Sequence, residues 1–265
     1  MDQRSNRAGG GGPGMIHKAA ALIAHQVTED DLKAINKYTL EPLTAEEVYT
    51  FRLVLCDNEL DRDHEHFTLR ALQDLQKLFV GKTGIKDHTW SADNQVARIY
   101  ATELVQGTKT TKQGELYTQL VAHCYMVKTP SNADLIAEIK GGIKKEVSVG
   151  CAVASAFCSI CGTDNTKSYC RHYPGKTYEK EGGAVLCTFA LDGGKDAYEF
   201  SFVAVPAQKA AGTSKSYTGE MVKDEAQGPA DPQTTGEGGA APDEVEKAAL
   251  LALRARMAAS KIKTQ

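Results

Sequence analysis

Two groups of residues in this 265-residue chain carry side chains that can do chemistry. The first is the pair of His88, in the polar segment GIKDHTWSADNQ, and Ser148, in the segment KKEVSVG. A serine hydroxyl becomes a useful nucleophile when an imidazole accepts its proton, and the imidazole needs a third group to hold its tautomer. On residue types alone, the ordinary interpretation is a loop histidine and a strand serine with no shared role.

The second group has the residue types and spacing of a metal site. Cys158-x2-Cys161 is followed by Cys170-x-His172, which places four candidate ligands within fifteen residues. Three thiolates and one imidazole complete a tetrahedral zinc site, and a site filled by protein at all four positions is structural rather than catalytic. Cys187 is an alternative for either of the two later ligands. Free thiols beside a surface histidine are the competing interpretation.

Composition excludes several classes of protein. The formal net charge of −3 gives no basic footprint for nucleic acid and no attraction to an anionic membrane. No apolar run reaches the length needed to span a bilayer. Seven cysteines, an odd number, three of them between positions 158 and 170, argue against a secreted disulfide framework and for a reducing compartment, the cytoplasm.

Strand and helix signals follow one another along the chain. Runs of β-branched and aromatic residues predict strands at residues 46–56, 96–105, 115–127, 146–153 and 198–205. Helices are predicted to start at Thr28, Thr68 and Ser131, and the first and last of these have a capping-box aspartate three residues later, Asp31 and Asp134. Because strands dominate, the predicted fold class is α+β, mostly β: a mixed or antiparallel β-barrel with peripheral helices.

Shifts in composition divide the chain into four segments. Residues 1–27 are expected to be a disordered arm with one short apolar stretch, and residues 28–210 a folded domain. The cysteine cluster forms an insert at about residues 155–185 of that domain. Residues 211–242 are rich in glycine and proline and predict a flexible linker. Residues 243–265 predict an amphipathic helix, with acids leading and bases closing it.

Three segments, in their order along the chain, resemble the tailed-phage prohead (capsid maturation) proteases: GKTGIKDHTWSADNQVARI, KKEVSVG and YEFSFVAVPAQ. In that family a loop histidine precedes a serine in an E-[VIL]-S-[VI]-G strand, and an E-[VF]-S-x-V-x-x-P-A segment closes the domain. The resemblance covers about residues 46–210. It implies an assemblin-like β-barrel with the nucleophile on a strand, which accounts for the lack of a G-x-S-x-G elbow.

The resemblance also implies roles for single residues. His88 would be the general base and Ser148 the nucleophile. Family members use an acidic third residue, and Glu199 matches that position best, with Asp196 and His123 as alternatives. Donors for the oxyanion stay open between the backbone near residue 150 and the turn at residues 141–145. Many family members lack a cysteine insert, so the predicted zinc is not essential to the chemistry.

The activity implied is that of a serine endopeptidase in phage head maturation. It would cleave the major capsid protein, the scaffold and, as a further candidate, itself, inside assembling proheads in the host cytoplasm. No nucleic-acid or membrane partner is expected, and a second copy of the chain is a candidate partner. The alternative is a non-enzymatic, zinc-stapled scaffold or assembly module with a degenerate site. A metal-dependent hydrolase is disfavoured by the filled ligand set.

Overall fold

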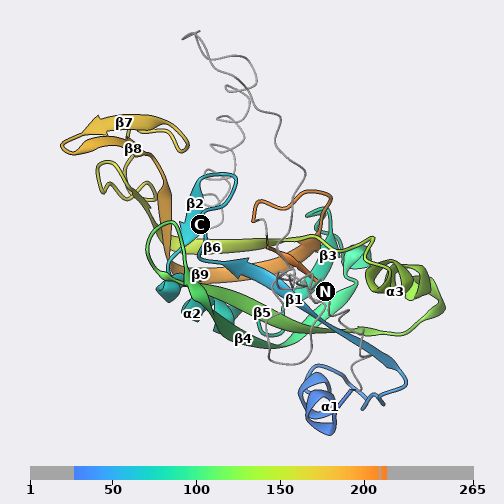
Figure 1. Ribbon diagram of the computed structural model, residues 1–265. Helices are drawn as coiled ribbons and strands as arrows, with labels where there is room; N and C mark the ends of the chain where they lie inside the picture. The colour runs from blue at the N-terminus through green and yellow to red at the C-terminus, as the bar shows by residue number, and fades with distance from the viewer. Residues whose placement is uncertain (1–26, 209, 214–265) are drawn as a thin grey trace, which may run out of the picture.

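A computed structural model describes residues 27–208 and 210–213 (Figure 1). In chain order the elements are α1 (Glu29–Ile35), β1 (Val48–Asp57), β2 (Glu65–Phe67), α2 (Leu69–Leu78), β3 (Thr83–Lys86), the 3₁₀ turn η1 (Ala92–Asn94), β4 (Ala97–Thr110), β5 (Leu116–Val127), the 3₁₀ turn η2 (Pro130–Asn132), α3 (Ala133–Lys140), β6 (Val147–Cys158), β7 (Thr177–Lys180), β8 (Gly183–Leu186), β9 (Phe189–Phe202) and β10 (Gly212–Thr213). The chain is therefore mostly β, with short helices, as the sequence predicts at this coarse level.

The strands form one mixed sheet rather than a closed barrel, which corrects the predicted architecture. Its order is β10-β1-β5-β4-β3-β9-β2, and β6 pairs with β9 on the side away from β3 and β2. β3 and β2 run parallel to β9, while β6 runs antiparallel to it. β10 has only two residues and meets the chain ahead of β6 through one isolated bridge, Gly212 to Glu146, so no continuous ladder closes the sheet. A separate two-stranded hairpin, β7–β8, projects away from the sheet (Figure 1).

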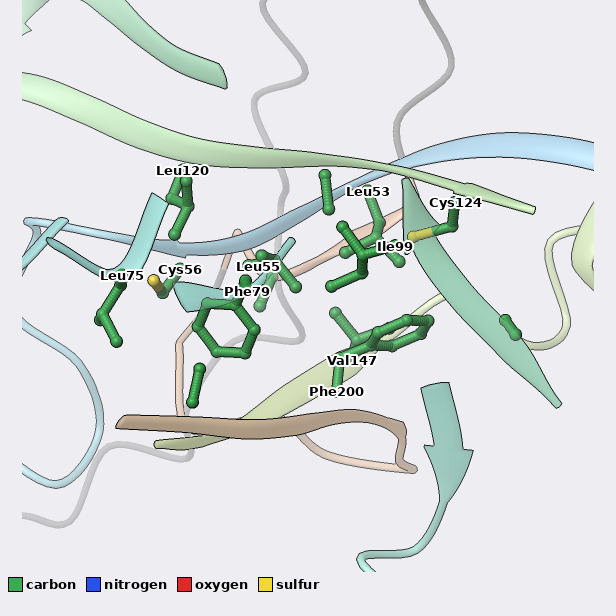
Figure 2. Packing of buried hydrophobic residues seen from close by; sticks show 14 of the residues in the cluster. Leu53, Leu55, Cys56, Leu75, Phe79, Ile99, Leu120, Cys124, Val147 and Phe200 are labelled. Carbon is green, nitrogen blue, oxygen red and sulfur yellow. The ribbon is translucent and has the colours of Figure 1, made fainter. Parts of the chain in front are cut away.

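The main hydrophobic core lies between β1 and β5 on one side and β6 and β9 on the other (Figure 2). α2 contributes its apolar face to this core: Leu72 and Leu75 are fully buried, and so is Phe79 just beyond its end. Thr68 caps the helix by accepting the N–H of Ala71 at 3.1 Å, as the sequence predicts. Burying each such leucine contributes roughly 1.5–3 kcal/mol, so this core fixes the strands that carry the candidate site.

The helix starts show where capping signals work and where they fail. At α1 the predicted capping box forms, because Thr28 and Asp31 exchange backbone and side-chain hydrogen bonds. The box predicted for Ser131 is wrong. α3 begins two residues later, and Asn132 instead accepts the N–H of Thr129 at 3.0 Å. The proline at position 130 starts a 3₁₀ turn there, which delays the α-helix.

β9 is much longer than the sequence predicts. Its first half contains Gly193 and Gly194, which are typical of a turn, yet the strand continues through both. A Cβ atom on Gly194 would lie 2.8 Å from the Cβ of Asp74 in α2. Glycine is therefore required here because the helix packs directly on the strand, and the Gly194 N–H donates to the Asp74 carboxylate at 3.1 Å.

Several predictions fall on residues that the structure does not describe. The N-terminal arm up to residue 26, the linker beyond residue 213 and the C-terminal helix at 243–265 lie outside the described residues. The start of the predicted linker is described, and Gly212 and Thr213 pair there with β1 as β10. Among the described residues no helix is both long and apolar enough to cross a membrane.

A buried carboxyl group at the end of β1 predicts how stability depends on pH. Burial raises the pKa of Asp57 to about 6, although its carboxylate accepts hydrogen bonds from the Glu59 N–H and the Tyr117 hydroxyl. The pKa in an unfolded chain is about 3.9, so the folded state binds this proton more tightly. The stabilisation is complete below about pH 4 and is lost as pH rises through about 6.

We therefore expect Asp57→Asn to flatten the stability profile. Between pH 5 and pH 8 the wild type should lose about 1.4 kcal/mol relative to the variant, because about one pH unit of the shift lies above pH 5; the loss is measured by urea unfolding at each pH. The exposed Glu41→Gln serves as the control and should follow the wild-type profile. Parallel curves for wild type and Asp57→Asn would contradict the assignment.

Candidate active site and metal centre

The two candidate catalytic groups that contact each other are His88 and Glu199. Nδ1 of His88 lies 2.9 Å from Oε1 of Glu199. Glu199, on β9, is only 3% exposed, whereas the His88 side chain is 41% exposed. A buried carboxylate in this position keeps the proton on Nδ1 and leaves Nε2 as the basic nitrogen. The pair thus has the arrangement of a general base with its orienting acid.

The turn that carries His88 has a strained backbone. Asp87 and His88 have φ values of 52° and 50°, in the left-handed region that non-glycine residues rarely adopt. Two successive groups at the end of β9 hold them: the Asp87 N–H donates to the Phe202 carbonyl at 3.0 Å, and the His88 N–H donates to Ser201 Oγ at 2.9 Å. Such strain persists only where neighbouring contacts fix the conformation.

A second set of hydrogen bonds stabilises the loop from within. The side-chain amide of Asn94 donates to the carbonyls of Lys86 and Thr89, both at 2.8 Å. These bonds connect the end of β3 to the loop beyond His88, and Ser91 caps the short 3₁₀ turn by accepting the Asn94 N–H at 3.2 Å. The loop is therefore anchored at both ends.

Ser148 lies on the strand beside this turn. In the antiparallel pairing of β6 with β9, Ser148 is opposite Ser201 and Gly150 is opposite Glu199. Side chains directly opposite each other have Cβ atoms about 4.5–5.5 Å apart. Ser148 is thus next to the residue whose hydroxyl holds His88. Among the described residues no hydrogen bond joins Ser148 to His88, and in enzymes without substrate such contacts are often long.

Gly150 leaves room for the acid. A Cβ atom at this position would lie 2.4 Å from Oε1 of Glu199. The carboxylate therefore lies directly over the glycine, and any larger residue would displace it. The pairing shifts at this point, because Cys151 is opposite Ala197, which leaves Tyr198 as an extra residue of β9. Bulges of this kind often re-aim side chains beside active sites.

The two alternatives for the third residue have other partners. Asp196 is 3.6 Å from the Lys82 ammonium, and His123 is 3.1 Å from Glu103. Of the three candidates, Glu199 is the one whose side chain has a described contact with His88. Its second oxygen, Oε2, is buried and has no hydrogen-bond partner among the described residues.

The turn at residues 141–145, one candidate source of oxyanion donors, is largely occupied. The N–H groups of residues 141–144 donate to carbonyls in the last turn of α3, where they cap the helix. They are therefore not available to a bound substrate in this conformation.

Beside the candidate site lies an exposed aromatic pair: Trp90 is 60% and Tyr198 41% exposed, and their ring centroids are 5.6 Å apart.

The predicted metal ligands come together in the segment between β6 and β9. One ligand atom from each of four residues lies within 4.8 Å of all the others: Cys158, Cys161, Cys170 and His172. Nδ1 of His172 is buried and has no hydrogen-bond partner among the described residues, as expected of a nitrogen that faces a metal. Hydrogen bonding between Cys161 and Thr163 lowers the pKa of Cys161 to about 6, which favours the thiolate form. This set can bind a metal such as zinc.

Cys187 lies next to this cluster but outside it. Its Sγ is 3.9 Å from Sγ of Cys158, and its side chain is buried. The four mutually close ligand atoms include His172 and not Cys187. The geometry therefore favours His172 as the fourth ligand.

Sequence reasoning did not single out Ser201 or Asn94, and it considered Gly150 only as a neighbour of oxyanion donors. A signal for Ser201 existed, because strand alternation places it on the same face as Glu199, two residues earlier. No comparable signal marks Asn94, whose role depends on the folded loop.

Comparisons with family models, with curated proteins and with solved structures gave no match.

The metal cluster predicts one zinc ion per chain. Cys170→Ser and His172→Ala should each lower the zinc content measured by elemental analysis, because removing one of four ligands weakens binding. Cys151→Ala, a cysteine outside the cluster, is the matched control and should keep its zinc. Cobalt substitution tests the ligand set further, because three thiolates with one imidazole absorb differently from four thiolates.

Loss of zinc should act locally. After chelation we expect faster hydrogen exchange in residues 159–188 and little change in the main core, which does not depend on these ligands. Purified chain without zinc, or the same zinc content in Cys170→Ser as in the wild type, would contradict the assignment.

Proposed function

We propose that the chain is a serine endopeptidase of phage head maturation, with Ser148 as nucleophile, His88 as general base and Glu199 as the orienting acid. The observation that carries the proposal is the 2.9 Å contact between His88 and the buried Glu199, directly beside the strand that bears Ser148. The order of the three sequence motifs, which resembles that of the prohead proteases, supports it independently. The finer fold assignment, an assemblin-like arrangement of strands, is part of the same proposal.

The chemistry follows from these positions. Ser148 Oγ attacks the carbonyl carbon of the scissile peptide while Nε2 of His88 accepts the hydroxyl proton. Glu199 stabilises the imidazolium that forms, from a carboxylate that solvent scarcely reaches. His88 then donates the proton to the leaving amine, and a water molecule, activated by the same nitrogen, hydrolyses the acyl-enzyme.

The proposed substrates are the scaffold and the major capsid protein, and the chain itself is a further candidate. Endopeptidases bind an extended stretch of polypeptide. The exposed pair of Trp90 and Tyr198 offers an apolar surface next to His88 and Glu199 for one of its side chains. A second copy of the chain remains a candidate partner within the prohead.

In this proposal the metal is zinc and its role is structural. Cys158 is the last residue of β6 and lies ten residues after Ser148 in the same strand. At about 3.3 Å per residue, the zinc ligands are roughly 33 Å along the strand from the nucleophile. Zinc at that distance polarises no substrate, and what it supplies is a fixed connection between the end of β6 and the insert.

A non-enzymatic assembly module is the second candidate function. Two observations favour it: the side chains of Ser148 and His88 share no hydrogen bond, and Oε2 of Glu199 has no partner among the described residues. A degenerate site would keep the fold and the zinc but would show no nucleophilic reactivity at Ser148. The experiment below separates the two functions.

Replacing the nucleophile should abolish cleavage and leave the fold intact. Ser148→Ala should fail to cleave the cognate capsid protein and fail to react with a fluorophosphonate, because it lacks the attacking oxygen. His88→Ala should lose as much activity, since base and nucleophile act as a unit. Ser155→Ala, on the same strand, is the control and should remain active. Wild-type cleavage by Ser148→Ala, or no reaction by the wild type, would refute the proposal.

Replacing the acid should reduce the rate without abolishing it. Glu199→Gln removes the charge that stabilises the protonated imidazole and favours the wrong tautomer, so we expect kcat to fall by about 10²–10⁴-fold. Asp196→Asn is the matched control in the same strand and should retain its rate. An unchanged rate in Glu199→Gln, with a loss in Asp196→Asn or in a His123 variant, would move the role to that residue.

A further inference from the structure

Ser201 occupies a central place between the proposed nucleophile and the proposed base. It lies on β9 with no exposure to solvent, and its Cα is directly opposite that of Ser148 on β6. Its Oγ accepts the backbone N–H of His88 at 2.9 Å. A side chain that is fully buried and already bonded in this way cannot act as the nucleophile. Its contacts indicate instead that it helps to position other groups, the His88 backbone above all.

The conformation of the His88 turn explains why a fixed acceptor is needed there. Asp87 and His88 are both in the left-handed region, which is unfavourable for residues with a Cβ atom. Strand β9 presents two acceptors to the turn, the Phe202 carbonyl for Asp87 and the Ser201 hydroxyl for His88. The first comes from the backbone and is independent of side-chain identity. The second exists only because residue 201 carries a hydroxyl group.

We propose that Ser201 is a positioning residue: its hydroxyl holds the His88 backbone in the left-handed conformation that brings the ring to Glu199 and to Ser148. This inference rests on the proposed function. From β9, Glu199 fixes the ring and Ser201 fixes the backbone of the same histidine, two residues apart on one face of the strand. Without the hydroxyl the turn keeps its bond to Phe202 but loses the one that sets the direction of the His88 side chain.

The test compares two substitutions at this position with a matched control. Ser201→Ala removes only the hydroxyl, while Ser201→Thr retains it. Thr102→Ala is the control, because it removes a hydroxyl that is likewise bonded to the backbone, here donating to the Gln76 carbonyl, but outside the candidate site. The full chain is used throughout. Two readouts are taken: the rate of Ser148 labelling by a fluorophosphonate, and the ring-nitrogen NMR signals of His88.

We expect labelling to slow by about 10–100-fold in Ser201→Ala, since small displacements of a catalytic group have effects of this size. The His88 ring signals should change from one tautomer with Nδ1 bonded to Glu199 to a mixture. Ser201→Thr should restore both readouts, and Thr102→Ala should leave both unchanged. If Ser201→Ala does not fold, Ser201→Cys, which keeps a side chain of similar shape with a weaker acceptor, replaces it, and the same losses are expected.

The outcomes separate this inference from the proposed function. If the wild type is labelled and Ser201→Ala is labelled at the same rate, the positioning role is overturned and the protease proposal remains intact. Slow labelling with unchanged His88 signals also overturns it, because Ser201 would then act by another route. If the wild type is not labelled, the protease proposal fails. The ring signals still decide the positioning role: a shift in Ser201→Ala supports it, and identical spectra overturn it.

Discussion

The pairing of β6 with β9 is the constraint on which the candidate site depends. Its register sets Ser148 opposite Ser201 and Gly150 opposite Glu199, so the proposed nucleophile, acid and positioning residue are brought together by one ladder. Because side chains alternate along a strand, a slip of one residue would send each of them to the core face. The core residues Val147 and Phe200, on the opposite face of the same strands, therefore protect the site by holding the register.

Burial of Glu199 has a cost that shapes its surroundings. An ionised carboxylate shielded from water is unfavourable by several kcal/mol unless a partner compensates, and the described partner of Glu199 is His88. The same burial keeps the interaction strong, since solvent does not screen it. The strained turn at residues 87–88 is a second cost, offset by bonds to the end of β9. Both costs are located where the proposed base must be held in one orientation.

Local features could be predicted from the sequence, whereas long-range contacts could not. Thr28 and Thr68 identify two helix starts because a cap acts within a few residues. The four candidate metal ligands can be predicted for the same reason, since their short spacing limits where they can lie, and their ligand atoms do lie close together. His88 and Glu199 are 111 residues apart, so no local pattern predicts their contact, and the resemblance to a family is the one link between them in the sequence. The sequence does not predict the first half of β9, because Gly194 is typical of a turn. The reason for a glycine there is the helix that packs on the strand, and this contact is visible only in the folded structure.

The metal cluster and the candidate site are related through the same pair of strands. Cys158 is opposite Phe189, so β6 and β9 enclose the long excursion at residues 159–188. Closing a flexible loop of that length costs roughly 3 kcal/mol by the logarithmic relation. The candidate ligands at positions 158, 161, 170 and 172 would divide this loop into shorter ones, and part of the closure cost would then fall on metal binding rather than on strand pairing. The register at Ser148 is set mainly by the core, and a bound metal would stabilise the far end of the ladder, where the second, smaller hydrophobic cluster has only a few members.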